Sequence, residues 1–144
     1  MIITLDTNVV LAALLSQNGA SHLILNLIID EKLNIALSTP VVLEYDDVLK
    51  RNTILEKLEL SENEINDVLD LLVLLADKHS IYYRLRPNLI DENDNLFVEC
   101  AFASRSHYLI TSNIRDFKRS ELISHPFQII TPGDFYYYWR CEHE

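Results

Sequence analysis

Apolar residues in this chain fall into short runs and into longer stretches with a period of about 3.6 residues. The short runs predict buried strands at residues 2–5, 35–37, 81–83, 108–111 and 127–130. The longer stretches predict helices at residues 9–15, 20–30, 40–51 and 61–78, and a further helix opened by residues 91–95. Strands that alternate with helices are typical of parallel βαβ units. We therefore expect an α/β fold, a three-layer α/β/α sandwich around a central, mainly parallel sheet of about five strands.

The segments between these elements carry weaker patterns. Residues 52–60 are predicted to be a polar connection, and residues 131–134 a turn. We expect a single domain over residues 1–144, in which residues 135–144 form a C-terminal tail. The aromatic residues of that tail could stack on nucleic-acid bases, although packing on the domain or on a partner is the simpler interpretation.

Charge and composition narrow the classes of function. The chain has 12 basic and 22 acidic residues, a formal net charge of −10, which argues against non-specific affinity for nucleic acid or anionic membranes. Its two cysteines are too few for a disulfide framework. The sequence contains no pattern of a signal peptide and no apolar run long enough to span a bilayer. A cytoplasmic protein with no membrane contact is the expectation.

Acidic and amide side chains lie where the predicted elements meet. Asp6 and Asn113 follow two of the strands, and Glu44 and Asp94 lie at or near the inward faces of helices. A parallel sheet can bring all four positions to one edge, where neighbouring carboxylates repel unless a cation lies between them. Oxygen ligands suit Mg²⁺ or Mn²⁺. The simpler alternatives are a helix cap at Asp6 and a salt bridge at Glu44.

These motifs resemble those of the PIN domain family, and within it the PIN-type toxins of bacterial and archaeal toxin–antitoxin pairs. The first motif is the apolar run that ends in Asp6-Thr-Asn8, and the second surrounds Glu44. The most specific match is Asp-Glu-Asn-Asp-Asn-Leu-Phe-Val-Glu-Cys-Ala at residues 91–101. The last is the strand that ends in Thr111-Ser-Asn113, followed by Asp116. The resemblance covers nearly the whole chain.

The resemblance implies a metal-dependent endoribonuclease, with Mg²⁺ or Mn²⁺ held by Asp6, Glu44, Asp94 and an acid of the last motif. Asn113 stands where many members of the family have Asp, and Asp116 is close enough in sequence to supply the acid. Asp6, Glu44, Asp94 and Asp116 are thus the candidate catalytic residues, with Asn113 as a further candidate metal ligand. The resemblance also implies an RNA substrate, a cognate antitoxin and a homodimer.

Several neighbouring residues are candidates for supporting roles. Thr7, Asn8 and Thr111 could orient Asp6 or bind a metal-coordinated water, or they could simply cap the helix and end the strand. Basic residues flank the acidic motifs and could hold RNA phosphates, or could be ordinary surface charges; they are Arg84, Arg86 and Arg115.

Two other functions remain open. The chain could be a catalytically weak module that binds an antitoxin or RNA, which Asn113 and the acidic composition favour. It could also be a phosphatase with Asp6 as nucleophile. That chemistry usually needs a second acid two residues later, where this chain has Asn8.

Overall fold

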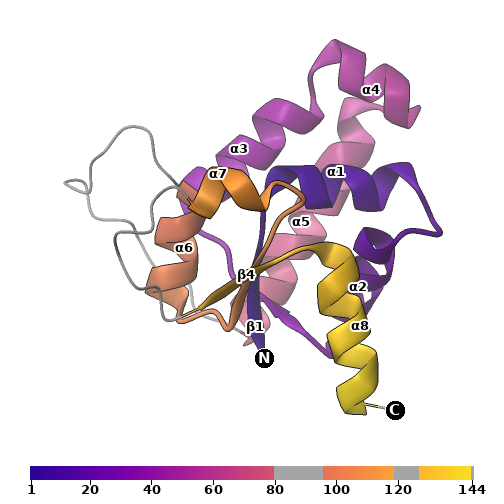
Figure 1. Ribbon diagram of the computed structural model, residues 1–144. Coiled ribbons are helices and arrows are strands. Elements are labelled where there is room, and N and C mark those ends of the chain that lie inside the picture. Colours follow the sequence, from indigo (N-terminus) through magenta and orange to yellow (C-terminus); the bar gives the residue numbers. More distant parts are fainter. Residues whose placement is uncertain (80–95, 119–126, 144) are drawn as a thin grey trace.

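The computed structural model describes residues 1–79, 96–118 and 127–143, and all structural statements below concern these residues (Figure 1). The predicted strand at residues 81–83 lies outside them. The first half contains β1 (Ile2–Leu5), α1 (Thr7–Leu15), α2 (Ala20–Ile29), β2 (Asn34–Ile35), α3 (Thr39–Leu49), α4 (Asn52–Leu58) and α5 (Glu62–His79). The second half contains α6 (Leu96–Ser104), β3 (Tyr108–Ile110), α7 (Ile114–Lys118), β4 (Gln128–Ile130) and α8 (Pro132–His143).

The described strands form one parallel sheet in the order β2-β1-β3-β4. In this register Leu5 lies beside Ile110, and Ile110 lies beside Ile130, so the strands end level with one another. The prediction of a parallel sheet is confirmed. The described part of the chain contains four strands, whereas the sequence predicted about five.

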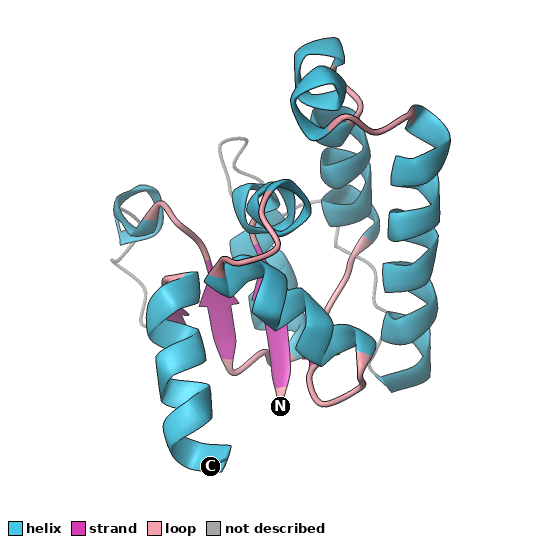
Figure 2. Cartoon of the chain, turned by 90° about the vertical axis from the view of Figure 1, so that its right-hand side faces the viewer, coloured by secondary structure: helices cyan, strands magenta, loops and turns pink. Residues whose placement is uncertain are grey.

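Helices cover both faces of the sheet, which confirms the predicted three-layer fold. In Figure 2, α2 lies in front of the sheet with α8 beside it, and α6 lies behind it. α2 packs against both α1 and α8, α6 packs against β1 and β3, and α5 packs against β2 and α3. The core between these layers consists of aliphatic and aromatic side chains that are almost fully buried, among them Ile3, Ile24, Tyr45, Leu72 and Phe135.

Local signals explain where the helices begin. The Ser38 hydroxyl accepts a hydrogen bond from Val41 N (3.4 Å), and Pro40 occupies the first turn of α3, where its missing N–H costs nothing. At α5 the predicted capping box forms. Ser61 N donates to Glu64 Oε1 (2.9 Å), and Glu64 N donates to Ser61 Oγ (3.2 Å).

Two predicted segments differ from the structure. Residues 52–58, predicted to be a polar connection, form α4, because Ile54, Leu55 and Leu58 pack on the core with helical spacing. The predicted turn at residues 131–134 is the start of α8, where the Thr131 hydroxyl accepts from Asp134 N (3.2 Å). Residues 135–143 of the predicted C-terminal tail continue this helix and pack on α2, in agreement with the simpler interpretation that the aromatic residues pack on the domain.

No single helix among the described residues has the length and apolarity needed to cross a membrane. Only α1 and α2 taken together reach that length and composition, with a bend of 97° between them.

Candidate active site

Asp6 lies at the centre of the carboxyl edge of the sheet, between the end of β1 and the start of α1. Its backbone N–H donates to Ile110 O on β3 (3.0 Å). Its Oδ1 accepts a hydrogen bond from Thr7 N (2.8 Å), so Asp6 is the N-cap of α1, as the simpler interpretation of the sequence proposed. Its Oδ2 accepts a hydrogen bond from the Thr111 hydroxyl (2.7 Å). The second bond is not part of a helix cap, and it fixes the plane of the carboxylate against the neighbouring strand.

Thr111, which follows β3, joins three segments at this edge. Its backbone N–H donates to Ile130 O (3.0 Å), which ties it to the end of β4. Its hydroxyl is fully buried and donates to Asp6, while it accepts from the backbone N–H of Asn113 (3.0 Å). One residue further, Ser112 N donates to Asn8 Oδ1 (3.4 Å). The segments that follow β1 and β3 are thus held together by side chains of both predicted motifs.

Tyr45 attaches α3 to the same edge. Its hydroxyl donates to Leu5 O (2.6 Å), the last carbonyl of β1, and its ring stacks on Phe97 of α6 with centroids 6.3 Å apart. The side chain is fully buried. Burial, and then unfavourable electrostatic interaction of the phenolate with Cys100 and Asp6, raise the pKa of the Tyr45 phenol well above its ordinary value of 10.0. Tyr45 therefore stays a neutral donor at physiological pH.

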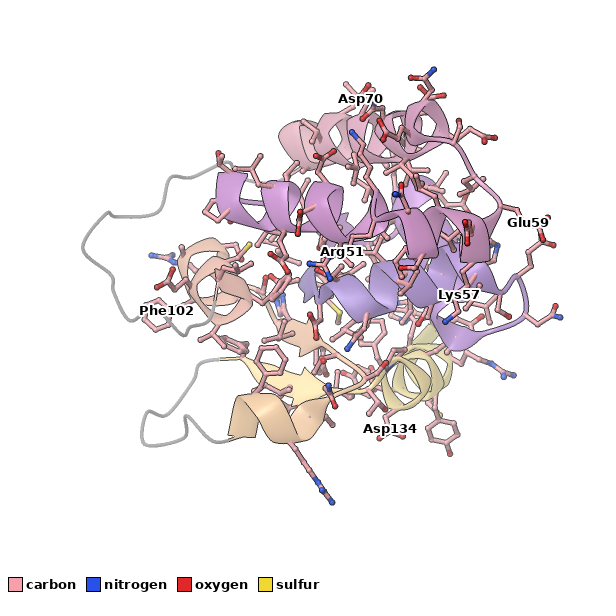
Figure 3. The ribbon with its side chains drawn as sticks, turned by 90° about the horizontal axis from the view of Figure 1, so that it is seen from above. Arg51, Lys57, Glu59, Asp70, Phe102 and Asp134 are labelled. Atoms are coloured by element: carbon pink, nitrogen blue, oxygen red, sulfur yellow. The ribbon has the colours of Figure 1, made fainter. Side chains whose placement is uncertain are left out.

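Glu44 is carried by the same turn of α3. Its side chain is half-buried and forms no hydrogen bond or ion pair with the residues that the structure describes. Because Tyr45 ties this turn to the last residue of β1, α3 lies against the edge where Asp6 is placed. In Figure 3, which looks down on that edge, α1, α3, α6 and α7 surround the ends of the strands.

Thr7 carries a buried hydroxyl that has no hydrogen-bond partner among the described residues. It occupies the first position of α1, next to Asp6. A buried hydroxyl without a partner costs about 1–3 kcal/mol, so native proteins rarely leave one unless a water, ion or ligand completes it.

The structure brings some of the predicted site residues together and leaves others undescribed. Asp6, Asn8, Thr111 and the backbone of Asn113 form one hydrogen-bonded cluster. The Asn113 side chain is exposed, and Arg115 is exposed on α7. Asp94, Arg84 and Arg86 lie outside the described residues, as does the side chain of Asp116, whose backbone belongs to α7. Among the described side chains, no three His, Cys, Asp or Glu groups converge on a metal position.

The donor set at this edge nevertheless fits a hard cation. The cluster presents carboxylate, amide and hydroxyl oxygens from Asp6, Asn8 and Thr111, which are the ligand types that Mg²⁺ and Mn²⁺ prefer. The Thr7 hydroxyl, which has no partner in the described part of the chain, adds an oxygen that a water could complete. The Thr111 bond to Asp6 Oδ2 resembles the outer hydrogen bonds that orient ligating carboxylates.

Sequence reasoning did not assign a role to Tyr45. A signal was available, because a tyrosine on the buried face of a helix needs a hydrogen-bond partner for its hydroxyl. The sequence alone could not identify that partner, since Leu5 O is 40 residues away along the chain.

Comparison with known proteins agrees with this geometry. Residues 3–115 match the PIN domain family. The fold is similar to that of a chain in the crystal structure of VapBC2 from Rickettsia felis bound to a DNA fragment from their promoter. That likeness has a TM-score of 0.56 at 21% identity and covers 91% of this chain and 98% of the other. No curated protein matches the sequence significantly. Because the family match extends over most of the chain and includes the strand ends and helices of the site, the chain belongs to the PIN domain family.

Proposed function

We propose that this chain is a Mg²⁺- or Mn²⁺-dependent endoribonuclease, the toxin of a toxin–antitoxin pair. The observation that carries the proposal is the Asp6 carboxylate at the carboxyl edge of a parallel sheet, oriented by Thr7 N and by the Thr111 hydroxyl. Ligands of open α/β sheets bind outside this edge.

The residues of the site have three proposed roles. Asp6, Glu44 and Asp94, with Asp116 or Asn113 as the fourth group, are the proposed holders of the metal. Thr111, Thr7 and Asn8 position Asp6 and the water beside it. When bound, the divalent cation lowers the pKa of a coordinated water and stabilises the charge on the phosphodiester. Arg84, Arg86 and Arg115 are the proposed contacts to RNA phosphates.

The partners follow from the family and from the similar fold. Hydrolysis of this type does not require a 2′-hydroxyl, so the choice of RNA rests on the PIN-type toxins that the chain resembles. The likeness to a VapBC2 chain supports a cognate antitoxin as partner. A homodimer that acts in the cytoplasm completes the proposal.

The direct test is Mn²⁺-dependent cleavage of single-stranded RNA by the wild type and by Asp6→Asn. Asparagine keeps the acceptor for Thr7 N, and the Thr111 hydroxyl can turn to accept from the new amide, so the fold should persist. We expect cleavage that is lost in Asp6→Asn and in EDTA. Asp70→Asn is the matched control, because Asp70 is exposed on α5 and lies away from the strand ends (Figure 3). Unchanged cleavage by Asp6→Asn would contradict the assignment.

A second candidate is a binding module that docks an antitoxin or RNA without turnover. The exposed Asn113, at the position where many PIN domains have Asp, favours it. Asn113→Asp separates the two functions. A folded wild type that forms a stable complex with its antitoxin, shows no cleavage and gains cleavage in Asn113→Asp would identify the binding module.

A further inference from the structure

Helices α2 and α8 enclose a cavity of about 540 Å³ that shares no residue with the site around Asp6. Three of its described lining residues carry or can acquire a positive charge, two are aromatic and one is aliphatic. They are Lys32, Arg140, His143, Tyr136, Trp139 and Leu27. None of the six is acidic, although the whole chain has a formal net charge of −10. A cationic hollow in such an acidic protein selects an anionic ligand.

The aromatic wall of the cavity is a stack of rings on α8. The Trp139 indole stacks on the His143 imidazole with centroids 3.6 Å apart and planes 14° apart, and on Phe135 at 6.4 Å. Because a carbonyl can only accept, His143 Nδ1 donates to Trp139 O (3.0 Å), and this bond fixes the imidazole over the indole. The indole remains half-exposed. A preformed, partly open aromatic stack beside cations suits a planar base joined to phosphates.

The charge of Lys32 is available to such a ligand. Lys32 follows the end of α2, is exposed, and forms no ion pair with the described residues. An acidic peptide could use the same charge, but its carboxylates would leave the stacked rings without a role. The combination of rings and cations therefore favours nucleic acid over an acidic peptide.

The cavity lies within reach of the proposed cleavage site. α8 begins directly after β4, at the carboxyl edge, and runs away from it (Figure 1). At a rise of about 1.5 Å per residue, Trp139 and His143 lie about 10 and 17 Å beyond Pro132 along the helix. β4 is two strands from β1, which corresponds to about 10 Å. A strand of a few nucleotides can span these distances.

We propose that the cavity between α2 and α8 binds a single-stranded segment of the RNA substrate outside the cleavage site. A base packs against Trp139 and His143, and Lys32 contacts the adjoining phosphate. This inference rests on the proposed ribonuclease function, since it assigns the cavity to the same RNA.

Trp139 is the only tryptophan in the chain, so its fluorescence reports on the cavity. We would titrate Asp6→Asn, which should not cleave, with an unstructured RNA of about ten nucleotides, a length within the range that single-strand sites cover. The expected result is a saturable change in Trp139 emission. Adding Lys32→Ala to this variant should weaken RNA binding about tenfold. It should also reduce the steepness of the plot of log association constant against log salt concentration by about 0.7, the value for one phosphate contact on a single strand. Lys57→Ala, at an exposed lysine of α4, should change neither quantity.

The absence of a saturable change in Trp139 emission would overturn the proposal. Equal RNA affinity with and without Lys32→Ala would also overturn it. So would a polyglutamate peptide that competes with the RNA and binds equally tightly. Cleavage by the wild type is measured separately. Cleavage without a Trp139 response refutes the cavity alone, whereas a Trp139 response without cleavage refutes the proposed nuclease and leaves the cavity as an RNA site.

Discussion

At the scale of single residues, the bond between the Thr111 hydroxyl and Asp6 Oδ2 is one that a simple helix cap does not need. A cap needs only the bond to Thr7 N, which is also present. The additional donor comes from another strand, 105 residues away, and is itself held by Asn113 N. The Thr111 hydroxyl therefore orients the Asp6 carboxylate at the edge of the sheet. The start of α1 does not require this second bond.

Thr111→Val tests this role. Valine keeps the shape of the side chain and removes the hydroxyl, so the orientation of Asp6 is lost. We expect metal affinity or activity to fall about 10–100-fold, and the free energy of unfolding to fall by about 1–3 kcal/mol.

The matched control for Thr111→Val is Thr4→Val. Thr4 is equally buried on β1, but its hydroxyl pairs with Ser106 Oγ (2.8 Å) and not with Asp6. The free energy of unfolding, measured by urea denaturation, should fall by a similar amount in this variant. Its activity should be retained. If both variants lose activity to the same degree, the effect of Thr111→Val reflects general destabilisation and not orientation.

Tyr45 makes stability depend on pH in the alkaline range. The pKa of its phenol is raised in the folded protein by burial and by unfavourable electrostatic interaction of the phenolate with Cys100 and Asp6. The unfolded chain therefore loses this proton first. The stabilisation is fully present below pH 10 and is lost as the pH rises from 10 toward the folded pKa. Urea unfolding of the wild type and of Tyr45→Phe should show a steeper alkaline loss in the wild type. If the free energy of unfolding falls equally with pH in both proteins, Tyr45 is not the source of the alkaline loss.

Tyr45→Phe should also destabilise the protein at neutral pH. Leu5 O would lose its partner, which costs about 1–3 kcal/mol for a buried acceptor.

At the scale of elements, the strands and most helices were predictable because their apolar periodicity coincides with local start signals. The capping box at Ser61 and the proline in the first turn of α3 are examples. The start of α8 was missed because Thr131-Pro-Gly-Asp134 carries the residue types of a turn, and only the contact with α2 decides that it is helical. α4 was missed because seven residues are too few to show a clear period.

In the described part of the chain, three helices end at or just before a residue with a left-handed backbone, and none of these residues is glycine. Glu31, Glu59 and Arg105 have φ values of 62°, 58° and 58°. This conformation costs a residue with a side chain about 1–2 kcal/mol, whereas glycine adopts it freely.

Glu59→Gly should therefore stabilise the protein. Glu59 is the exposed C-cap of α4 (φ 58°, ψ 41°), and its replacement should raise the free energy of unfolding by about 0.5–1 kcal/mol after the entropy cost of glycine. Glu56→Gly, inside the same helix, should lower it by about 1 kcal/mol. The two variants are compared by urea denaturation, and a loss of stability in Glu59→Gly would show that its side chain makes an overriding contact.

At the scale of the whole molecule, the location of the candidate site was predictable from the sequence, but its geometry was not. Asp6 and Asn113 follow strands, and a parallel sheet places such residues at one edge, as the shared cluster with Thr111 confirms. The alternation of strands and helices contains no information on which hydroxyl meets which carboxylate. The anchoring of α3 through Tyr45, and the cavity between α2 and α8, likewise depend on tertiary packing.

We propose that the Asp6 carboxylate is part of a divalent-metal site at the carboxyl edge of the sheet. Calorimetric titration with Mn²⁺ of the wild type, Asp6→Asn and Asp70→Asn tests it most directly. We expect a binding isotherm for the wild type and for Asp70→Asn, and its loss in a folded Asp6→Asn. Equal Mn²⁺ binding by the wild type and Asp6→Asn, or no binding by the wild type, would contradict it.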